Sequence, residues 1–244
     1  MKAWRSVLSA MLTAVMLTVL SGCLYPDDEL EQSQIPAKDA ILSVQSVIDQ
    51  YQKDTGLLPI VNSEPETPVY EKYQVDFGKL VRLKYVSDIP SAAFEKGGSY
   101  YFLIINEETD PTIKLMNLVL YQKVNDIQRA VQAYATANNG VLPKGDERYP
   151  GFYQIDYGKL KKSELKVQSV YSGQTLQTMM DDKGNVYIDY AVDLMQAAQK
   201  AGLDQIPEKQ DLRPYLVDTS DFVPVKSTVY YLVQGEPVPQ AAGQ

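Results

Sequence analysis

Apolar residues recur at helical spacing in two stretches of the chain. The first stretch carries Ile41, Val44, Val47, Ile48 and Tyr51. The second runs from Ile113 through Met116, Leu120, Val124, Ile127 and Val131 to Tyr134. Such spacing places the apolar side chains on one face of a helix. Gly56 with Pro59, and Gly140, then end the two patterns,. We therefore predict two amphipathic helices, the second capped by Asp110 with Pro111 in its first turn.

Shorter segments show the pattern of β-strands. Alternating or continuous apolar positions predict strands over residues 73–77, 81–86, 100–105, 152–157, 165–171, 185–190 and 228–233,. A further helix is expected over residues 191–201, ending at Gly202, and the Pro- and Ala-rich tail from Gly235 to Gln244 is expected to fray,. A helix followed by a small, mainly antiparallel sheet is an α+β architecture.

The chain contains an internal repeat. Tyr73–Leu80 (YQVDFGKL) returns as Tyr153–Leu160 (YQIDYGKL) with six identities in eight positions, and a Gly-x-Leu-Pro segment precedes each copy at residues 56–59 and 140–143. A third pair of segments is also similar, residues 87–90 before Tyr100–Leu103 and residues 220–224 before Tyr230–Val233. Matches in the same order favour a tandem duplication. We predict two related α+β units, residues 37–110 and 111–234, the second with an insertion near 161–215, and a flexible tail over 235–244.

Composition removes several classes of function. The 244 residues include one Cys and no His. Histidine-dependent catalytic triads, histidine metal ligands and internal disulfides are therefore excluded. A formal net charge of -8 disfavours a nucleic-acid partner, because phosphate binding needs clustered Lys and Arg,. No cofactor or metal site is predicted.

The first residues have the pattern of an export signal. Lys2 and Arg5 precede Val7–Leu20, an apolar run without charge that is shorter than the roughly 20 residues of a membrane-spanning helix,. The run ends in Leu20-Ser21-Gly22-Cys23, and Cys23 is the only cysteine. This ending resembles the lipobox of bacterial lipoproteins, in which the Cys is diacylglyceryl-modified and becomes the new N-terminus. The resemblance covers residues 1–23 only.

The lipobox resemblance implies a location. Residues 1–22 would be removed as a signal peptide, and Cys23 would carry the lipid, with palmitate among its acyl chains. The chain would then be exported and anchored at the extracytoplasmic face of the bacterial cell membrane. Without Lys2 and Arg5 the mature chain has 21 basic and 31 acidic residues, a net charge of -10. Residues 23–36 are polar and acidic and are predicted to form a tether,.

The repeated carboxylates are the strongest catalytic candidates in the sequence. Asp76 and Asp156 occupy the same place in the two copies. A pair of carboxylates can perform acid–base chemistry in glycoside cleavage when held at the right separation. Alternatively, each Asp begins a short turn or helix and caps its free N–H groups. The residue pattern favours capping.

Two further motifs have simple structural interpretations. Asp181-Asp182-Lys183-Gly184-Asn185 contains oxygen ligands, but their positions differ from those of a calcium-binding EF-hand loop,. We predict a hairpin turn there. Ser163-Glu164-Leu165-Lys166 has the Ser-x-x-Lys spacing of penicillin-recognising enzymes without their companion motifs,. A surface turn is predicted instead.

The sequence favours binding over catalysis. The main hypothesis is a non-enzymatic, lipid-anchored envelope protein that contacts the membrane through Cys23 and binds an envelope protein as an accessory or assembly factor. One alternative is an envelope hydrolase or glycan-processing enzyme that uses Asp and Glu. Another is a solute-binding lipoprotein of a transporter. The oligomeric state, the partner and the process are open at this point.

Overall fold

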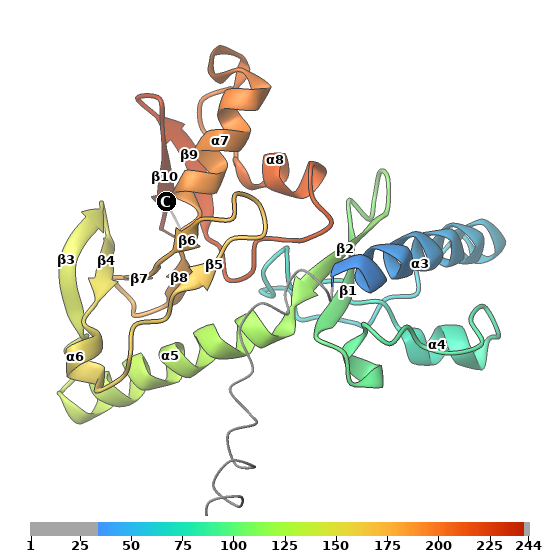
Figure 1. The fold of residues 1–244 in the computed structure, drawn as a ribbon, viewed down its shortest axis with the longest axis horizontal. Helices are drawn as coiled ribbons and strands as arrows, with labels where there is room; N and C mark the ends of the chain where they lie inside the picture. The colour runs from blue at the N-terminus through green and yellow to red at the C-terminus, as the bar shows by residue number, and fades with distance from the viewer. Residues whose placement is uncertain (1–33, 242–244) are drawn as a thin grey trace, which may run out of the picture. The chain divides into compact units, whose positions relative to one another are not determined.

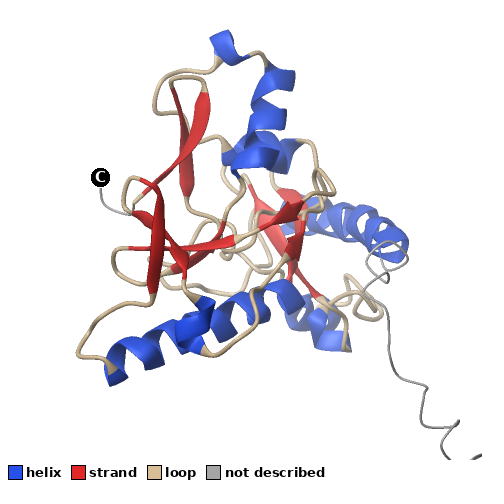
Figure 2. Ribbon diagram, turned by 60° about the vertical axis from the view of Figure 1, so that its left-hand side comes forward, coloured by secondary structure: helices blue, strands red, loops and turns tan. Residues whose placement is uncertain are grey.

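The computed structural model describes residues 34–241, and Figure 1 shows the order of their helices and strands. The α-helices are α3 (Gln34–Thr55), α4 (Phe77–Arg82), α5 (Leu118–Ala137), α6 (Tyr157–Leu160), α7 (Ala191–Ala201) and α8 (Arg213–Asp218). The strands are β1 (Tyr100–Ile105), β2 (Thr112–Asn117), β3 (Lys144–Tyr149), β4 (Phe152–Ile155), β5 (Val167–Gln168), β6 (Thr175–Leu176), β7 (Thr178–Asp181), β8 (Val186–Ile188), β9 (Val229–Val233) and β10 (Glu236–Gln240). These strands pair antiparallel in small sheets (Figure 2), and the predicted α+β class is confirmed. Cys23 lies outside the described residues.

In the first helix-then-sheet unit, from α3 to β2, one glutamine side chain connects the helix to the β1–β2 hairpin. We call this connection the glutamine joint. On Gln45 of α3, the side-chain Nε2 donates to the Pro111 carbonyl at 2.9 Å, and Oε1 accepts from the Ile113 amide at 2.8 Å. The apolar face of α3 is buried as its spacing predicts,. The buried residues of this face are Ile41, Val44, Ile48 and Tyr51.

The second unit, from α5 to β8, has the same joint. On Gln128 of α5, Nε2 donates to the Gly184 carbonyl and Oε1 accepts from the Val186 amide, both at 2.7 Å. Val124, Ile127 and Val131 are buried on this helix at the spacing that Ile41, Val44 and Ile48 have on α3. The matching bonds show that the β7–β8 hairpin corresponds to the β1–β2 hairpin.

The Asp of the repeated sequence motif makes the same backbone contact in both units. The Asp76 amide donates to the Pro59 carbonyl at 2.7 Å, and the Asp156 amide donates to the Pro143 carbonyl at 2.8 Å. A short helix follows each Asp. The predicted strand over 73–77 is wrong, because Gln74 and Val75 form only isolated bridges and Phe77 already begins α4. The predicted strand over 81–86 is also wrong, since α4 and the turn after it occupy these residues.

The second amphipathic helix begins later than predicted. Residues 112–117 form β2, and α5 starts at Leu118, with the Asn117 side chain accepting from the Leu120 amide at 2.9 Å. Asp110 is not its cap. Ile113 and Met116 fit the helical stripe that continues into α5, yet Ile113 and Leu115 also alternate as a strand requires,. Pairing with β1 over six residues decides between the two patterns.

A third helix and hairpin follow the second unit. The helix predicted over 191–201 is confirmed as α7, which packs on β10. The third pair of similar segments does not fall in matching units. Tyr230–Val233 lies in β9 of this third part, whereas Tyr100–Leu103 lies in β1 of the first unit. The tail predicted to fray contains β10, which pairs with β9 from Glu236 to Gln240. The β7–β8 hairpin lies within the predicted insertion at 161–215, and the predicted domain boundaries stay predictions.

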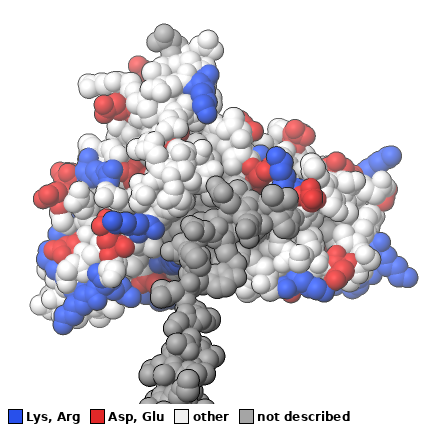
Figure 3. Space-filling view, viewed as in Figure 1, with Lys and Arg blue, Asp and Glu red and all other residues white. Residues whose placement is uncertain are grey.

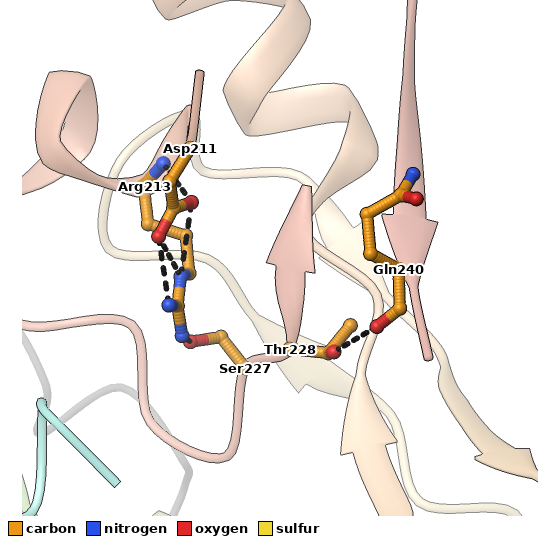
Figure 4. A network of polar contacts seen from close by, with 5 residues as sticks. All are labelled: Asp211, Arg213, Ser227, Thr228 and Gln240. Atoms are coloured by element: carbon orange, nitrogen blue, oxygen red, sulfur yellow. Dashed lines mark hydrogen bonds and ion pairs between the residues drawn. The ribbon is translucent and has the colours of Figure 1, made fainter. Parts of the chain in front are cut away.

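The chain between α8 and β9 contacts both earlier hairpins. The Leu115 amide of β2 donates to the Asp221 carbonyl at 2.8 Å, and the Ile188 amide of β8 donates to the Lys226 carbonyl at 3.0 Å. Figure 4 shows the polar contacts at the end of this segment next to β9: Arg213 is paired with Asp211 and also reaches Ser227, while Thr228 donates to the Gln240 carbonyl at 2.7 Å. We call residues 220–228 the connector.

Candidate functional site

Asp76 and Asp156 are helix caps. The Asp76 carboxylate accepts from the Lys79 amide at 2.7 Å, and the Asp156 carboxylate accepts from the Lys159 amide at 3.0 Å. An Asp at this position satisfies an N–H group that has no partner inside the helix. The capping interpretation of the sequence is confirmed for both residues.

The two capping carboxylates are not brought together. Asp156 is paired with its own neighbour Lys159 at 3.1 Å, and the Lys159 amide and ammonium hold the pKa of Asp156 below its usual value. In Figure 1, α4 and α6 lie at opposite sides of the view. A shared acid–base site requires both groups to face one substrate, and this arrangement does not provide it.

The segment Asp181–Asn185 is the turn of the β7–β8 hairpin, as predicted. Asp181 is buried, and its Oδ1 accepts from the amides of Lys183 and Asn185 at 2.9 and 2.8 Å. Its Oδ2 accepts from the Asn185 side chain at 2.8 Å and from the Tyr187 hydroxyl at 3.3 Å. These donors occupy the oxygens that a cation would need. Across residues 34–241 no group of three or more acidic or Cys side chains could hold a metal ion.

The Ser-x-x-Lys segment is an exposed connection between α6 and β5. Ser163, Glu164 and Lys166 are exposed, and residues 163–166 have no regular secondary structure. A nucleophilic Ser needs a base held against its hydroxyl. No hydrogen bond of this kind is found at Ser163 within the described part of the chain; the segment is at the surface as predicted, but it is an irregular connection and not a turn.

A buried acidic network at the start of α7 was not predicted from the sequence. Asp189 accepts hydrogen bonds from the hydroxyls of Tyr230 at 3.0 Å and Tyr149 at 3.1 Å, and from the Ala191 amide at 3.0 Å. Arg148 completes the group with an ion pair at 3.0 Å. Burial and the charge of Asp189 together raise the pKa of Tyr149 to about 12, and they also raise the pKa of Tyr230. All of these partners come from β3, β9 and α7.

Asp193 is the second carboxyl of this network. It is 2% exposed, and its Oδ2 accepts from the Ser169 hydroxyl at 2.8 Å. Its Oδ1 is buried without a hydrogen-bond partner. Burial raises the pKa of Asp193 above its usual value, against the smaller opposing effects of Ser172 and Ser169, and the charge of Asp189 raises it further.

The chemistry open to this network is the gain and loss of a proton at Asp193. Asp189 is fully paired, whereas Asp193 has one satisfied and one unsatisfied oxygen. The sequence holds one signal that could have revealed it: Asp193 stands between Val192 and Leu194 in an apolar helical run. A charged residue on a helix face that packs inward is unusual unless it has a role or a partner.

Neither the surface charge seen in Figure 3 nor the described helices point to a second candidate site. On the face drawn in Figure 3, acidic and basic side chains are interspersed and form no large patch of one sign. Among the described helices, none combines the length and the apolar character that crossing a membrane requires.

Part of the chain is similar to a known protein family. Residues 37–117 match the family model described as the YphF family N-terminal domain. The matched segment ends at Asn117, the residue that caps α5, so it corresponds to the first helix-then-sheet unit without the helix of the second. No curated protein and no solved structure matches the chain.

Proposed function

We propose that the chain is a lipid-anchored protein of the bacterial cell envelope that acts by binding an envelope protein, and not by catalysis. One observation carries the anchoring part: the only cysteine, Cys23, follows two small residues at the end of an uncharged apolar run. Lipid attachment at Cys23 would hold the acidic chain at the membrane without a spanning helix.

The state of the candidate carboxylates supports binding over catalysis. Asp76 and Asp156 are engaged in helix caps. The buried oxygens of Asp181 and Asp189 accept several hydrogen bonds each. Catalytic carboxylates must remain free to contact a substrate. The chain has no His, the residue that most often acts as a general base,.

Metabolic labelling with an alkyne-bearing palmitate analogue tests the anchor in a bacterial host. We expect the wild-type chain to be labelled and to sediment with membranes, and Cys23→Ser to be unlabelled and to accumulate with its leader. Ser21→Ala, which keeps a small residue beside Cys23, is the matched control and should be labelled normally. Equal labelling of wild type and Cys23→Ser, or no labelling of either, would contradict the proposal.

Cross-linking in intact cells tests the binding part. We expect wild type to give a discrete cross-linked protein species that Cys23→Ser loses, because only the anchored chain reaches its partner. Turnover of an envelope substrate that is abolished by Asp76→Asn or Asp156→Asn would contradict a non-catalytic role.

A further inference from the structure

After Val186 two acids, Asp189 and Asp193, are buried, whereas the chain after Ile113 carries apolar side chains, a buried Met116 and a partly buried Leu120. Asp189 lies three residues after Val186, as Met116 lies three residues after Ile113, and Ile113 and Val186 are bound by the equivalent glutamines. Asp193 lies seven residues after Val186, and Leu120 lies seven after Ile113. The fold of the unit therefore accepts apolar residues at both positions. Burial of a carboxyl is unfavourable, so its presence at Asp193 calls for a separate reason.

Asp193 lies under the tip of the β5–β6 hairpin, residues 169–174. The tip is a turn built around the Ser169 side chain, whose Oγ accepts from the amides of Tyr171 and Ser172 at 3.0 and 3.2 Å. The same hydroxyl donates its single proton to Asp193. Since both acceptor sites of Oγ are used by amides, the Ser169 proton has to point at Asp193. This bond therefore joins the tip to α7.

The tip in turn holds the connector. The Tyr171 hydroxyl donates to the Phe222 carbonyl at 3.2 Å, and the Tyr171 ring packs edge-on against Tyr190 at 6.1 Å between centroids. The Tyr190 hydroxyl donates to the Val225 carbonyl at 3.1 Å. Phe222 itself bridges to Leu115 of β2. The ends of the hairpin are fixed independently, because Val167 and Leu176 are buried in the core.

We propose that this tip is an acid-sensitive latch, closed over Asp193 when that carboxyl is neutral and lifted when the carboxyl is charged. Lifting the tip would admit water to the unpaired Oδ1 and would release Tyr171 from the connector. A loop that is anchored at both strands and held at its tip by a few polar contacts and one partly buried ring, Tyr171, can open without global unfolding,.

The direction follows from proton linkage. In the closed form burial raises the pKa of Asp193, whereas a hydrated carboxyl in the open form has an ordinary pKa. The closed form therefore binds the proton more tightly, and its advantage is lost as the pH rises through the pKa of the closed form. The closed-to-open ratio changes by about tenfold for each unit by which the two pKa values differ.

The charged or titratable groups around Asp193 are one other acid, one arginine and four tyrosines. The titratable or charged neighbours are Asp189, Tyr190, Tyr171 and, beyond Asp189, Arg148, Tyr149 and Tyr230. Burial raises the pKa values of these four tyrosines, so the tyrosines stay neutral at acid and neutral pH. Asp189 is held by Arg148.

Hydrogen exchange of the full chain, followed by mass spectrometry from acid to neutral pH, tests the latch. After correction for the intrinsic pH dependence of exchange, we expect protection of residues 169–174 to fall as the pH rises in wild type. In Asp193→Asn protection should be high and independent of pH. The matched control is Asp182→Asn, an exposed carboxylate on the neighbouring turn, which should behave as wild type. Ser169→Ala should leave the tip poorly protected at every pH.

A measurement on wild type keeps the test independent of how the variants fold. The pH titration of the Asp193 carboxyl carbon by NMR should have the same midpoint as the change in tip protection. Tip protection that does not vary with pH in wild type, a pH dependence that survives in Asp193→Asn, or midpoints that differ would each overturn the latch.

Discussion

The first and second helix-then-sheet units share their backbone connections and differ in what they bury. Gln45 and Gln128 bind equivalent backbone groups of their hairpins, and Pro59 and Pro143 accept from the amides of the capping Asp residues. Three residues after the amide that each glutamine binds, however, the chain buries Met116 in β2 and Asp189 after β8. The shared bonds therefore form whether an apolar residue or an acid follows the hairpin-bound position.

The repeated motif itself is packed unequally. Leu80 ends YQVDFGKL and is fully buried, whereas Leu160 ends YQIDYGKL and is only partly buried. The helix that contains Leu80 has six residues, and the helix that contains Leu160 has four. Identical residues in a duplication thus carry different shares of the packing energy, which variants can measure.

The largest expected effect is the loss of the Leu80 side chain. Leu80→Ala should lower the free energy of unfolding by about 2–5 kcal/mol, because it removes transfer energy and leaves a cavity in a fully buried site. Leu160→Ala should have clearly less effect, since its site is partly open to water. Urea denaturation of the full chain measures both. The control is Val81→Ala at an exposed position, and equal effects at Leu80 and Leu160 would refute the unequal packing.

The next effect is the loss of either glutamine joint. Gln45→Ala and Gln128→Ala each leave a backbone N–H and a carbonyl without their partner, which should cost about 1–3 kcal/mol. The two values should agree closely if the joints are equivalent. Gln132→Ala, an exposed glutamine on α5, should change stability little,. A destabilisation by one joint variant and not by the other would show that the units depend on different contacts.

Local signals predicted much of this arrangement. The repeated motif, the Gly-x-Leu-Pro segments and the apolar stripes identified α3, most of α5, the role of Asp76 and Asp156 as caps, and the turn at Asp181–Asn185. These features depend on residues close together in the chain. Cys23 lies outside the described residues, and its role stays a prediction.

Features set by distant contacts were missed. Residues 112–117 suit a helix or a strand, and only pairing with β1 selects the strand. The contact that Asp193 makes inside the protein is with Ser169, which lies 24 residues away in the sequence. The contacts of Gln45 and Gln128 could not be predicted from the sequence either. An amphipathic pattern identifies the buried face of a helix, but it does not show which polar residue beside that face binds a backbone group.

The smallest effect is expected at the helix caps, where the two units can be compared residue by residue. Asp76→Ala should cost about 1 kcal/mol, since the Lys79 amide loses its acceptor,. Asp156→Ala should cost less, because its helix is shorter and more exposed. The pKa of Asp156 is lowered in the folded chain, so its contribution is present above its unfolded pKa and is lost as the pH falls through the folded value,. Asp156→Asn keeps the acceptor and should remove that pH dependence, which urea denaturation at a series of pH values would measure. An unchanged pH dependence in Asp156→Asn would mean that another carboxylate is responsible.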